Sequence, residues 1–194
     1  MCGIGGALLE EGSVVEPLLE GLRLLEYRGY DSAGIAVLGA GGIAIRRKEG
    51  RIERLEAELA TELQGGALAS ARAGIGHTRW ATHGPPSDVN AHPHTDEKGR
   101  VAVVHNGVFE NYLELRRELG RAGVRFASDT DTEVLAHLVG LEMERGLDLA
   151  EAVRRSLARV TGYYAIAAIA IRDGEPRLVC ARQGPPLMVA VTPK

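Results

Sequence analysis

A cysteine stands directly after the first methionine, and this position gives it chemistry that an internal cysteine lacks. Removal of Met1 leaves Cys2 as the first residue, with a free α-amine beside its thiol. The reference pKa of an α-amine is about 7.7–8.0, which suits a general base at neutral pH. Cys2 then holds a nucleophile and a base in one residue. Taken alone, an accidental cysteine is the simpler interpretation, but the Gly-rich stretch CGIGG would let a substrate approach the chain end.

The second group of polar residues is HTRWATHG at 77–84, followed by NAHPH at 90–94. Arg79 offers the two-pronged guanidinium that fits an α-carboxylate. Four histidines in this stretch also suggest a metal site, but no acid or thiolate stands at ligand spacing. A third interpretation is a loop whose histidines bond to nearby backbone groups. We predict no metal and no cofactor.

Two further motifs complete the set. VVHNG at 103–107 predicts a strand that ends in Asn106 and Gly107, where a side-chain amide and an unhindered N–H can stabilise an oxyanion. The alternative is a plain Asn-Gly turn. SDTDTE at 128–133 predicts a helix start, where Ser or Thr capping explains the polar residues and Asp131 could equally hold an ammonium group. Together the four motifs predict hydrolysis of the side-chain amide of a free α-amino acid.

Strands and helices must position these residues, and hydrophobic periodicity predicts both. Capping patterns mark two helix starts, Ser13 with Glu16 and Asp148 with Glu151. The polar stretch 80–100 is long for a connection, and such loops are often functional. Strands that gather at both ends of the chain favour an α+β class in a single domain. The expected strands are Gly3–Leu9, Ala33–Leu38, Ile43–Arg47, Gly74–Thr78, Val101–His105, Tyr163–Ile171, Arg177–Ala181 and Leu187–Val191, and the helices beyond the two capped ones are Arg51–Leu63, Glu110–Ala122 and Asp131–Arg145.

Composition narrows the class of protein. The chain has 194 residues, of which 45% are hydrophobic and 25% charged, as in an average soluble globular protein. Its net charge of −3 gives no reason to expect nucleic acid or an anionic membrane as a partner. The two cysteines suggest no disulfide framework, and no signal peptide or transmembrane stretch is evident. We therefore expect a cytoplasmic enzyme.

The order of the motifs resembles a known family. CGIGG, LEYRGYDSAGIA, GHTRWATHG, NAHPH, VVHNGVFEN and SDTDTEV are similar to the glutaminase domain of the glutamine–fructose-6-phosphate aminotransferases, which are class II glutamine amidotransferases. YRGYDSAG and HTRWATHG favour that family over the amidotransferases of other pathways. The resemblance implies the four-layer αββα sandwich of N-terminal-nucleophile hydrolases. It also implies L-glutamine as substrate and a role in glucosamine 6-phosphate synthesis.

The resemblance assigns a role to each motif. Cys2 is the expected nucleophile, with its own α-amine as base. Asn106 and the N–H of Gly107 are the expected oxyanion hole. Arg79 is expected to bind the α-carboxylate of glutamine, and Asp131 its α-ammonium group.

Other residues are expected to surround the substrate. Four of them would close over or lie near glutamine, namely Trp80, Thr82, His83 and His92. Arg28 and Asp31 would support the nucleophile, although a simple structural ion pair is the alternative.

The full-length family members continue into a sugar isomerase part, which is absent here, and their glutaminase domain runs past Lys194. We expect one glutaminase domain over residues 1–194 that lacks its C-terminal end, with a homodimer as one option for its assembly. Three alternatives stay open: a glutaminase that serves another acceptor, a non-catalytic glutamine-binding module that retains Met1, and a peptidase or acylase. Arg79 and Asp131 suit a free amino acid better than a peptide.

Overall fold

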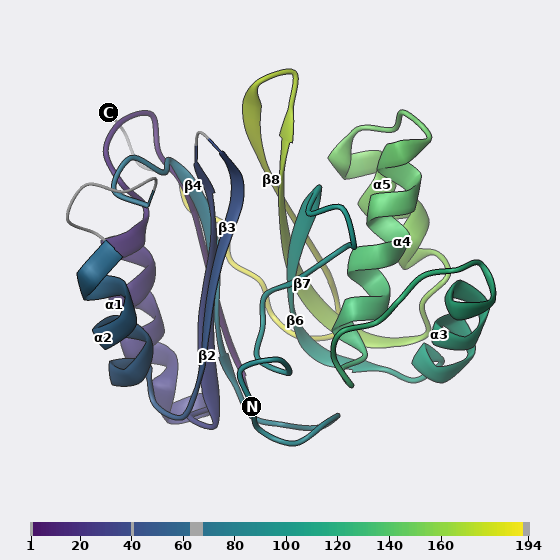
Figure 1. Ribbon diagram of the computed structural model, residues 1–194, viewed down its shortest axis with the longest axis horizontal. Helices are drawn as coiled ribbons and strands as arrows, with labels where there is room; N and C mark the ends of the chain where they lie inside the picture. Colours follow the sequence, from purple (N-terminus) through teal and green to yellow (C-terminus); the bar gives the residue numbers. More distant parts are fainter. Residues whose placement is uncertain (1, 40, 63–67, 192–194) are drawn as a thin grey trace.

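The computed structural model describes residues 2–39, 41–62 and 68–191, which form two antiparallel sheets lying face to face (Figure 1). The strand order is β1-β4-β2-β3 in the first sheet and β5-β6-β7-β8 in the second. The strands are β1 (Gly3–Leu8), β2 (Ser32–Gly39), β3 (Gly42–Glu49), β4 (Ala73–Arg79), β5 (His94–Thr95), β6 (Val101–Phe109), β7 (Gly162–Arg172) and β8 (Glu175–Gln183). The helices are α1 (Val15–Leu25), the 3-10 helix η1 (Glu26–Arg28), α2 (Ile52–Glu62), α3 (Tyr112–Arg121), α4 (Thr132–Glu144) and α5 (Leu149–Leu157).

Helices cover the outer face of each sheet. Helices α1 and α2 pack on the first sheet, and α4 and α5 pack on the second, with α3 against α4 (Figure 1). A separate apolar cluster lies between the two sheets and draws its residues from β2, β4, β6 and β7. The layers therefore run helix, sheet, sheet, helix, and the expected αββα sandwich is confirmed.

The apolar run in β7 shows why the central strands lack a polar face. Ile166 and Ala168 contact the helix side, whereas Ala167 and Ile169 contact the opposite sheet. Because successive side chains of a strand point to opposite faces, a strand covered on both faces must be apolar throughout. Full burial of one isoleucine stabilises the fold by about 1.5–3 kcal/mol.

Three sequence predictions need comment. The predicted strand Leu187–Val191 is wrong, because this segment has no ladder partner among the described residues and Met188 is 94% exposed. The Ser13–Glu16 capping box is also wrong: Val14 caps α1 without a side-chain bond, and the Ser13 hydroxyl accepts a bond from Val15 N–H at 3.3 Å. The Asp148 cap is confirmed by a 2.8 Å bond from Glu151 N–H. Ala40, between the predicted strands Ala33–Leu38 and Ile43–Arg47, and Leu63, at the end of the predicted helix Arg51–Leu63, lie outside the described residues.

Candidate active site

One cavity of about 950 Å³ collects almost all of the predicted site residues. It lies where the start of β1, the end of β4 and the second half of β6 meet the start of α4. Asp31 is the only predicted site residue that does not line it. The predicted residues that line it are Cys2, Arg28, Arg79, Trp80, Thr82, His83, His92, Asn106, Gly107 and Asp131.

Cys2 is held at this cavity by the pairing of β1 with β4. Because Gly3 lies opposite Thr78 in that register, Cys2 reaches the end of β4. Its Sγ accepts a hydrogen bond from Trp80 N–H at 3.2 Å and donates to Trp80 O at 3.5 Å. Burial raises the pKa of the Cys2 thiol, against the opposing effect of the Trp80 N–H. Met1 lies outside the described residues.

Asn106 and Gly107 lie inside β6, so neither the predicted strand end at His105 nor an Asn-Gly turn is right. Strand β6 continues to Phe109 and pairs with β7, with Gly107 opposite Tyr164. Gly107 has φ +139°, and a Cβ atom there would lie 1.9 Å from Tyr163 O, so only glycine fits. The Asn106 Nδ2 donates to Cys2 O at 3.2 Å, which places the amide beside the thiol residue.

Arg79 ends β4 and is 3% exposed. Its Nη2 donates to His83 O and, at 3.2 Å, to Gly84 O, which holds the loop after β4. Its Nη1 is buried and has no hydrogen-bond partner among the described residues. Burial lowers the pKa of Arg79, against the attraction of nearby acidic groups. A buried guanidinium nitrogen at a cavity wall is suited to an anionic ligand.

Asp131 lies at the N-cap of α4 and is 4% exposed. Its Oδ2 accepts a hydrogen bond from Phe109 N–H at 2.9 Å. The Nδ1 atoms of His83 and His105 lie 3.9 Å from the same oxygen. A buried carboxylate with a single backbone donor to this oxygen keeps acceptor capacity for a cationic ligand.

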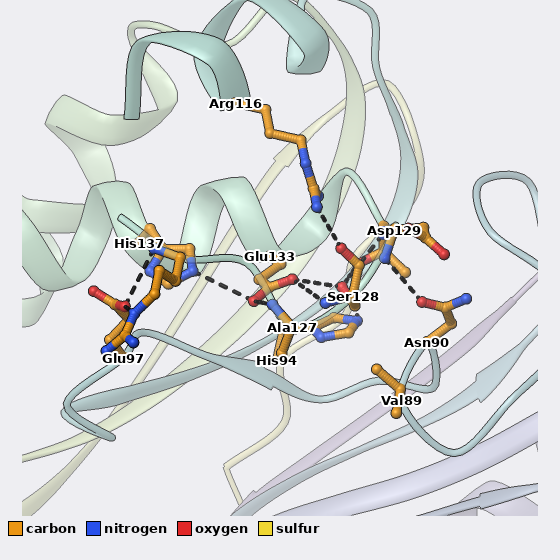
Figure 2. A network of polar contacts seen from close by, with 12 residues as sticks. Val89, Asn90, His94, Glu97, Arg116, Ala127, Ser128, Asp129, Glu133 and His137 are labelled. Carbon is orange, nitrogen blue, oxygen red and sulfur yellow. Dashed lines mark hydrogen bonds and ion pairs between the residues drawn. The ribbon is translucent and has the colours of Figure 1, made fainter. Parts of the chain in front are cut away.

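A polar network holds the segment before Asp131, and it is not the predicted Ser or Thr cap. Glu133 accepts hydrogen bonds at 2.7 Å from Ala127 N–H, Ser128 N–H and the Ser128 hydroxyl (Figure 2). Burial alone would raise the pKa of Glu133, but bonds from His137, Ala127 and Ser128 outweigh it and lower that pKa to about 2. Glu133 therefore stays ionised and fixes the approach to Asp131.

The same segment is tied to the long loop after β4. Thr130 Oγ1 lies 2.9 Å from His94 Nε2. Asp129 N–H donates to Asn90 Oδ1 at 2.9 Å (Figure 2). Arg47, from β3, donates Nη1 to the carbonyl oxygens of residues 89, 91 and 93 at 3.3–3.4 Å. The loop is therefore fastened by β3 of the first sheet and by the segment that precedes α4.

The side chain of Asp31 holds the backbone of the loop after β4. One carboxylate oxygen accepts from Ala81 N–H, and the other accepts from the Ser32 hydroxyl at 2.9 Å. Arg28, in η1, reaches the cavity wall. Asp31 thus contacts the loop whose Trp80 N–H bonds Cys2, and support of the nucleophile by Arg28 and Asp31 stays a prediction.

The buried histidines form a neutral cluster. Burial lowers the pKa of His77 and His94 to about 3 and that of His105 to about 4, and it lowers the pKa of His92 well below its usual value. Within residues 2–39, 41–62 and 68–191, no three His, Cys, Asp or Glu side chains form a group that could hold a metal ion. These histidines bond to groups far away in the sequence, as His77 does to the carbonyl oxygen of His105 and His94 to the hydroxyl of Thr130, so the third interpretation, in which they bond to local backbone groups, is wrong.

Sequence reasoning missed several cavity residues. Thr130 and His105 stood inside motifs already noted, so their position was the available signal. Tyr163 and the segment 185–188 also line the cavity, and nothing in their local sequence indicated a site.

The comparisons with known proteins agree with this geometry. A family model described as glutamine amidotransferase domain matches residues 77–193. The chain is 48% identical over 191 residues to the isomerizing glutamine–fructose-6-phosphate aminotransferase of Streptomyces coelicolor, and 53% identical over 192 residues to that of a Thermus thermophilus strain. Each alignment covers 98% of this chain, and the chain spans only about 30% of the length of either relative.

Among solved structures, the glutamine phosphoribosylpyrophosphate amidotransferase of Bacillus subtilis, complexed with ADP and GMP, matches with a TM-score of 0.70. The match has 26% identity and covers 88% of this chain and 35% of that chain. Fold and site thus define an amidotransferase of the N-terminal-nucleophile type. The chain belongs to the glutamine amidotransferase domain family. No helix in the described part of the chain is long and apolar enough to cross a membrane.

Proposed function

We propose that Cys2 hydrolyses the side-chain amide of L-glutamine and releases ammonia. One observation carries this proposal: a single cavity holds a thiol, an amide donor beside it, a buried cation with an unpaired nitrogen and a buried carboxylate. Free glutamine presents three matching groups: an amide for the thiol and the amide donor, a carboxylate for the cation, and an ammonium group for the carboxylate. Related amidotransferase domains support the same substrate.

The two charged residues would hold the amino acid end. The α-carboxylate would bind the unpaired Nη1 of Arg79, and the α-ammonium group would bind Asp131. Trp80, Thr82 and His83 lie on the loop that Arg79 holds, so carboxylate binding and loop position are coupled. The fourth predicted neighbour, His92, lines the cavity beside them.

The amide end would lie at Cys2. The thiolate attacks the amide carbon, and the oxyanion that forms accepts hydrogen bonds from Asn106 Nδ2 and Gly107 N–H. The C–N bond then breaks, and ammonia leaves with a proton from the Cys2 α-ammonium group. Water, deprotonated by the same amine, hydrolyses the thioester to glutamate and restores the thiol. The base exists only after Met1 is removed, because an acylated nitrogen cannot take up the proton.

The fate of ammonia rests on the relatives. We propose that the full-length protein passes it to fructose 6-phosphate through a C-terminal sugar isomerase part, as the names of the aligned aminotransferases indicate. A glutaminase that serves another acceptor is the rival. A cytoplasmic location, a homodimer and a single glutaminase domain stay predictions.

Intact-mass spectrometry combined with glutamate release from glutamine tests the proposal. A chain without Met1 should form glutamate, and Cys2→Ala should abolish that activity while the chain stays folded. Cys180→Ala is the matched control, because Cys180 lies in β8 away from the cavity and its loss should leave activity unchanged. A chain that lacks Met1 and forms no glutamate contradicts the proposal.

A further inference from the structure

His77 contacts the side-chain amide of Asn106 on the side away from Cys2. It lies in β4, in the first sheet, and is fully buried. Its Nε2 lies 2.9 Å from Asn106 Oδ1 and 3.0 Å from the carbonyl oxygen of His105. Its Nδ1 is buried and has no partner among the described residues. One ring nitrogen thus meets two oxygens of β6 in the opposite sheet.

The chemistry of these oxygens fixes the tautomer. The carbonyl oxygen of His105 can only accept a hydrogen bond, so Nε2 must carry the proton. The pKa of about 3, caused chiefly by burial, keeps the ring neutral at physiological pH, and Nδ1 then has the lone pair. The ring of His92, 4.2 Å away between centroids, packs against this neutral imidazole.

The tautomer in turn fixes the Asn106 side chain. A proton on Nε2 attracts the amide oxygen and repels the amide N–H₂ group, so the oxygen must face His77. The Nδ2 then faces Cys2, where it donates to Cys2 O at 3.2 Å. Rotation of the amide by half a turn would place its oxygen, with its lone pairs, against any developing oxyanion.

We propose that His77 is a positioning residue that holds the Asn106 amide with its donor group toward Cys2. The inference rests on the proposed role of Asn106 in the oxyanion hole. His77 itself does not line the cavity, so its proposed effect on the reaction is exerted through Asn106. It contributes only to the step in which negative charge develops on the side-chain amide oxygen of the substrate glutamine.

His77→Phe removes the donor and keeps an aromatic ring of similar size. We expect kcat for glutamate release to fall by about 10- to 100-fold, less than the roughly 10²–10³-fold loss of a whole oxyanion donor. The KM for glutamine should stay near the wild-type value, because Arg79 and Asp131 are intact. His77→Gln, whose amide can donate to Asn106 Oδ1, should recover part of kcat and serves as the second variant if the phenylalanine variant does not fold.

Alkylation of Cys2 by iodoacetamide separates positioning from general disturbance. This displacement forms no oxyanion, so its rate at Cys2, measured by peptide mass spectrometry, should not change in His77→Phe. An equal fall in the alkylation rate and in kcat would show that His77 acts on the thiol instead, and would overturn the inference.

A double-mutant cycle with Asn106→Ala completes the test. If His77 acts through Asn106, the double variant His77→Phe/Asn106→Ala should have the kcat of Asn106→Ala alone. If the fold-losses in kcat of the two single variants multiply in the double variant, the inference is overturned, while the proposed function still stands. If Asn106→Ala itself has wild-type kcat, the oxyanion role fails, and the inference falls with it.

Discussion

Two segments face the same cavity, and they are held in different ways. In residues 126–133, which include Asp131, the carboxylate of Glu133 accepts hydrogen bonds from two backbone N–H groups and a hydroxyl. In residues 80–84, the backbone is held at Ala81 by Asp31 and at residues 83 and 84 by Arg79, and the Trp80 side chain is 49% exposed. The first segment is held by the buried side chain of Glu133, and the second is a more exposed loop whose backbone is held by Cys2, Asp31 and Arg79.

The difference indicates how the α-carboxylate and the α-ammonium group of glutamine would each be bound. Asp131, the proposed partner of the ammonium group, is fixed by folding, since Glu133 and its donors need no ligand. Arg79, the proposed partner of the carboxylate, is also an anchor of its loop. We infer that the ammonium side is formed before glutamine arrives and that the carboxylate side is completed by it.

Asp131→Asn should have the largest effect, and it asks whether the fixed segment serves binding. The introduced asparagine can still accept from Phe109 N–H, so the free energy of unfolding should change little. The loss of a buried charge partner should lower kcat/KM for glutamine by about 1000-fold. Asp129→Asn, two residues away and exposed, is the control and should leave kcat/KM unchanged. An equal effect of both substitutions on kcat/KM would show that Asp131 does not bind glutamine.

Glu133→Gln tests the network itself. Glutamine keeps one acceptor oxygen and places an N–H₂ group against backbone donors, so the free energy of unfolding should fall by about 3 kcal/mol. Urea denaturation measures this loss. Glu97→Gln is the control, because Glu97 forms an exposed pair with Arg125 and such pairs contribute about 0–1 kcal/mol. A loss below about 1 kcal/mol for Glu133→Gln would show that the two segments are anchored alike.

The same residue predicts a pH dependence. The pKa of Glu133 is lowered from 4.5 to about 2 in the folded state, so its contribution is fully present above about pH 4.5. It is lost as the pH falls from 4.5 toward 2. The stability difference between wild type and Glu133→Gln, followed by urea denaturation, should therefore be constant near neutral pH and shrink below pH 4.5. A difference that grows in acid contradicts the ionised network.

Sequence alone could predict the layers better than the site geometry. The distribution of strands and helices along the chain indicates an α+β class, because hydrophobic periodicity is local, and the family motifs imply the sandwich. The predicted strand Leu187–Val191 failed for the converse reason. Its apolar residues favour a strand, but a strand also needs a ladder partner, and local sequence cannot supply one.

Within the site, residue types were predictable and contacts between the sheets were not. Arg79 and Asp131 were predicted because their charges match those of an amino acid, and both line the cavity. The bond between His77 and Asn106 depends on how β4 faces β6 across two sheets, and neither local motif sets that. The run SDTDTE was interpreted as a helix start with a Ser or Thr cap, because its local sequence fits a cap as well as it fits the network around Glu133.

Asn90→Ala should have the smallest effect, and it sharpens the comparison because Asn90 joins the two segments. Its Nδ2 donates to Pro85 O at 3.0 Å, next to the open loop, and its Oδ1 accepts from Asp129 N–H at 2.9 Å. Loss of two such bonds should cost about 1–2 kcal/mol of unfolding free energy. Arg79 would then be the anchor left at residues 83 and 84, and the loop would be held less firmly. Glutamine should bind more weakly to it, so the KM for glutamine should rise while kcat stays close to wild type.

Asn111→Ala is the matched control for this change. Asn111 also donates to one carbonyl, Arg159 O at 2.8 Å, and accepts from one backbone N–H, that of Thr161, at 2.9 Å, and it does not line the cavity. Both variants should lose stability, but only Asn90→Ala should raise the KM. If the two variants share a wild-type KM, the open loop is positioned without the buried segment, and the two walls of the cavity act independently.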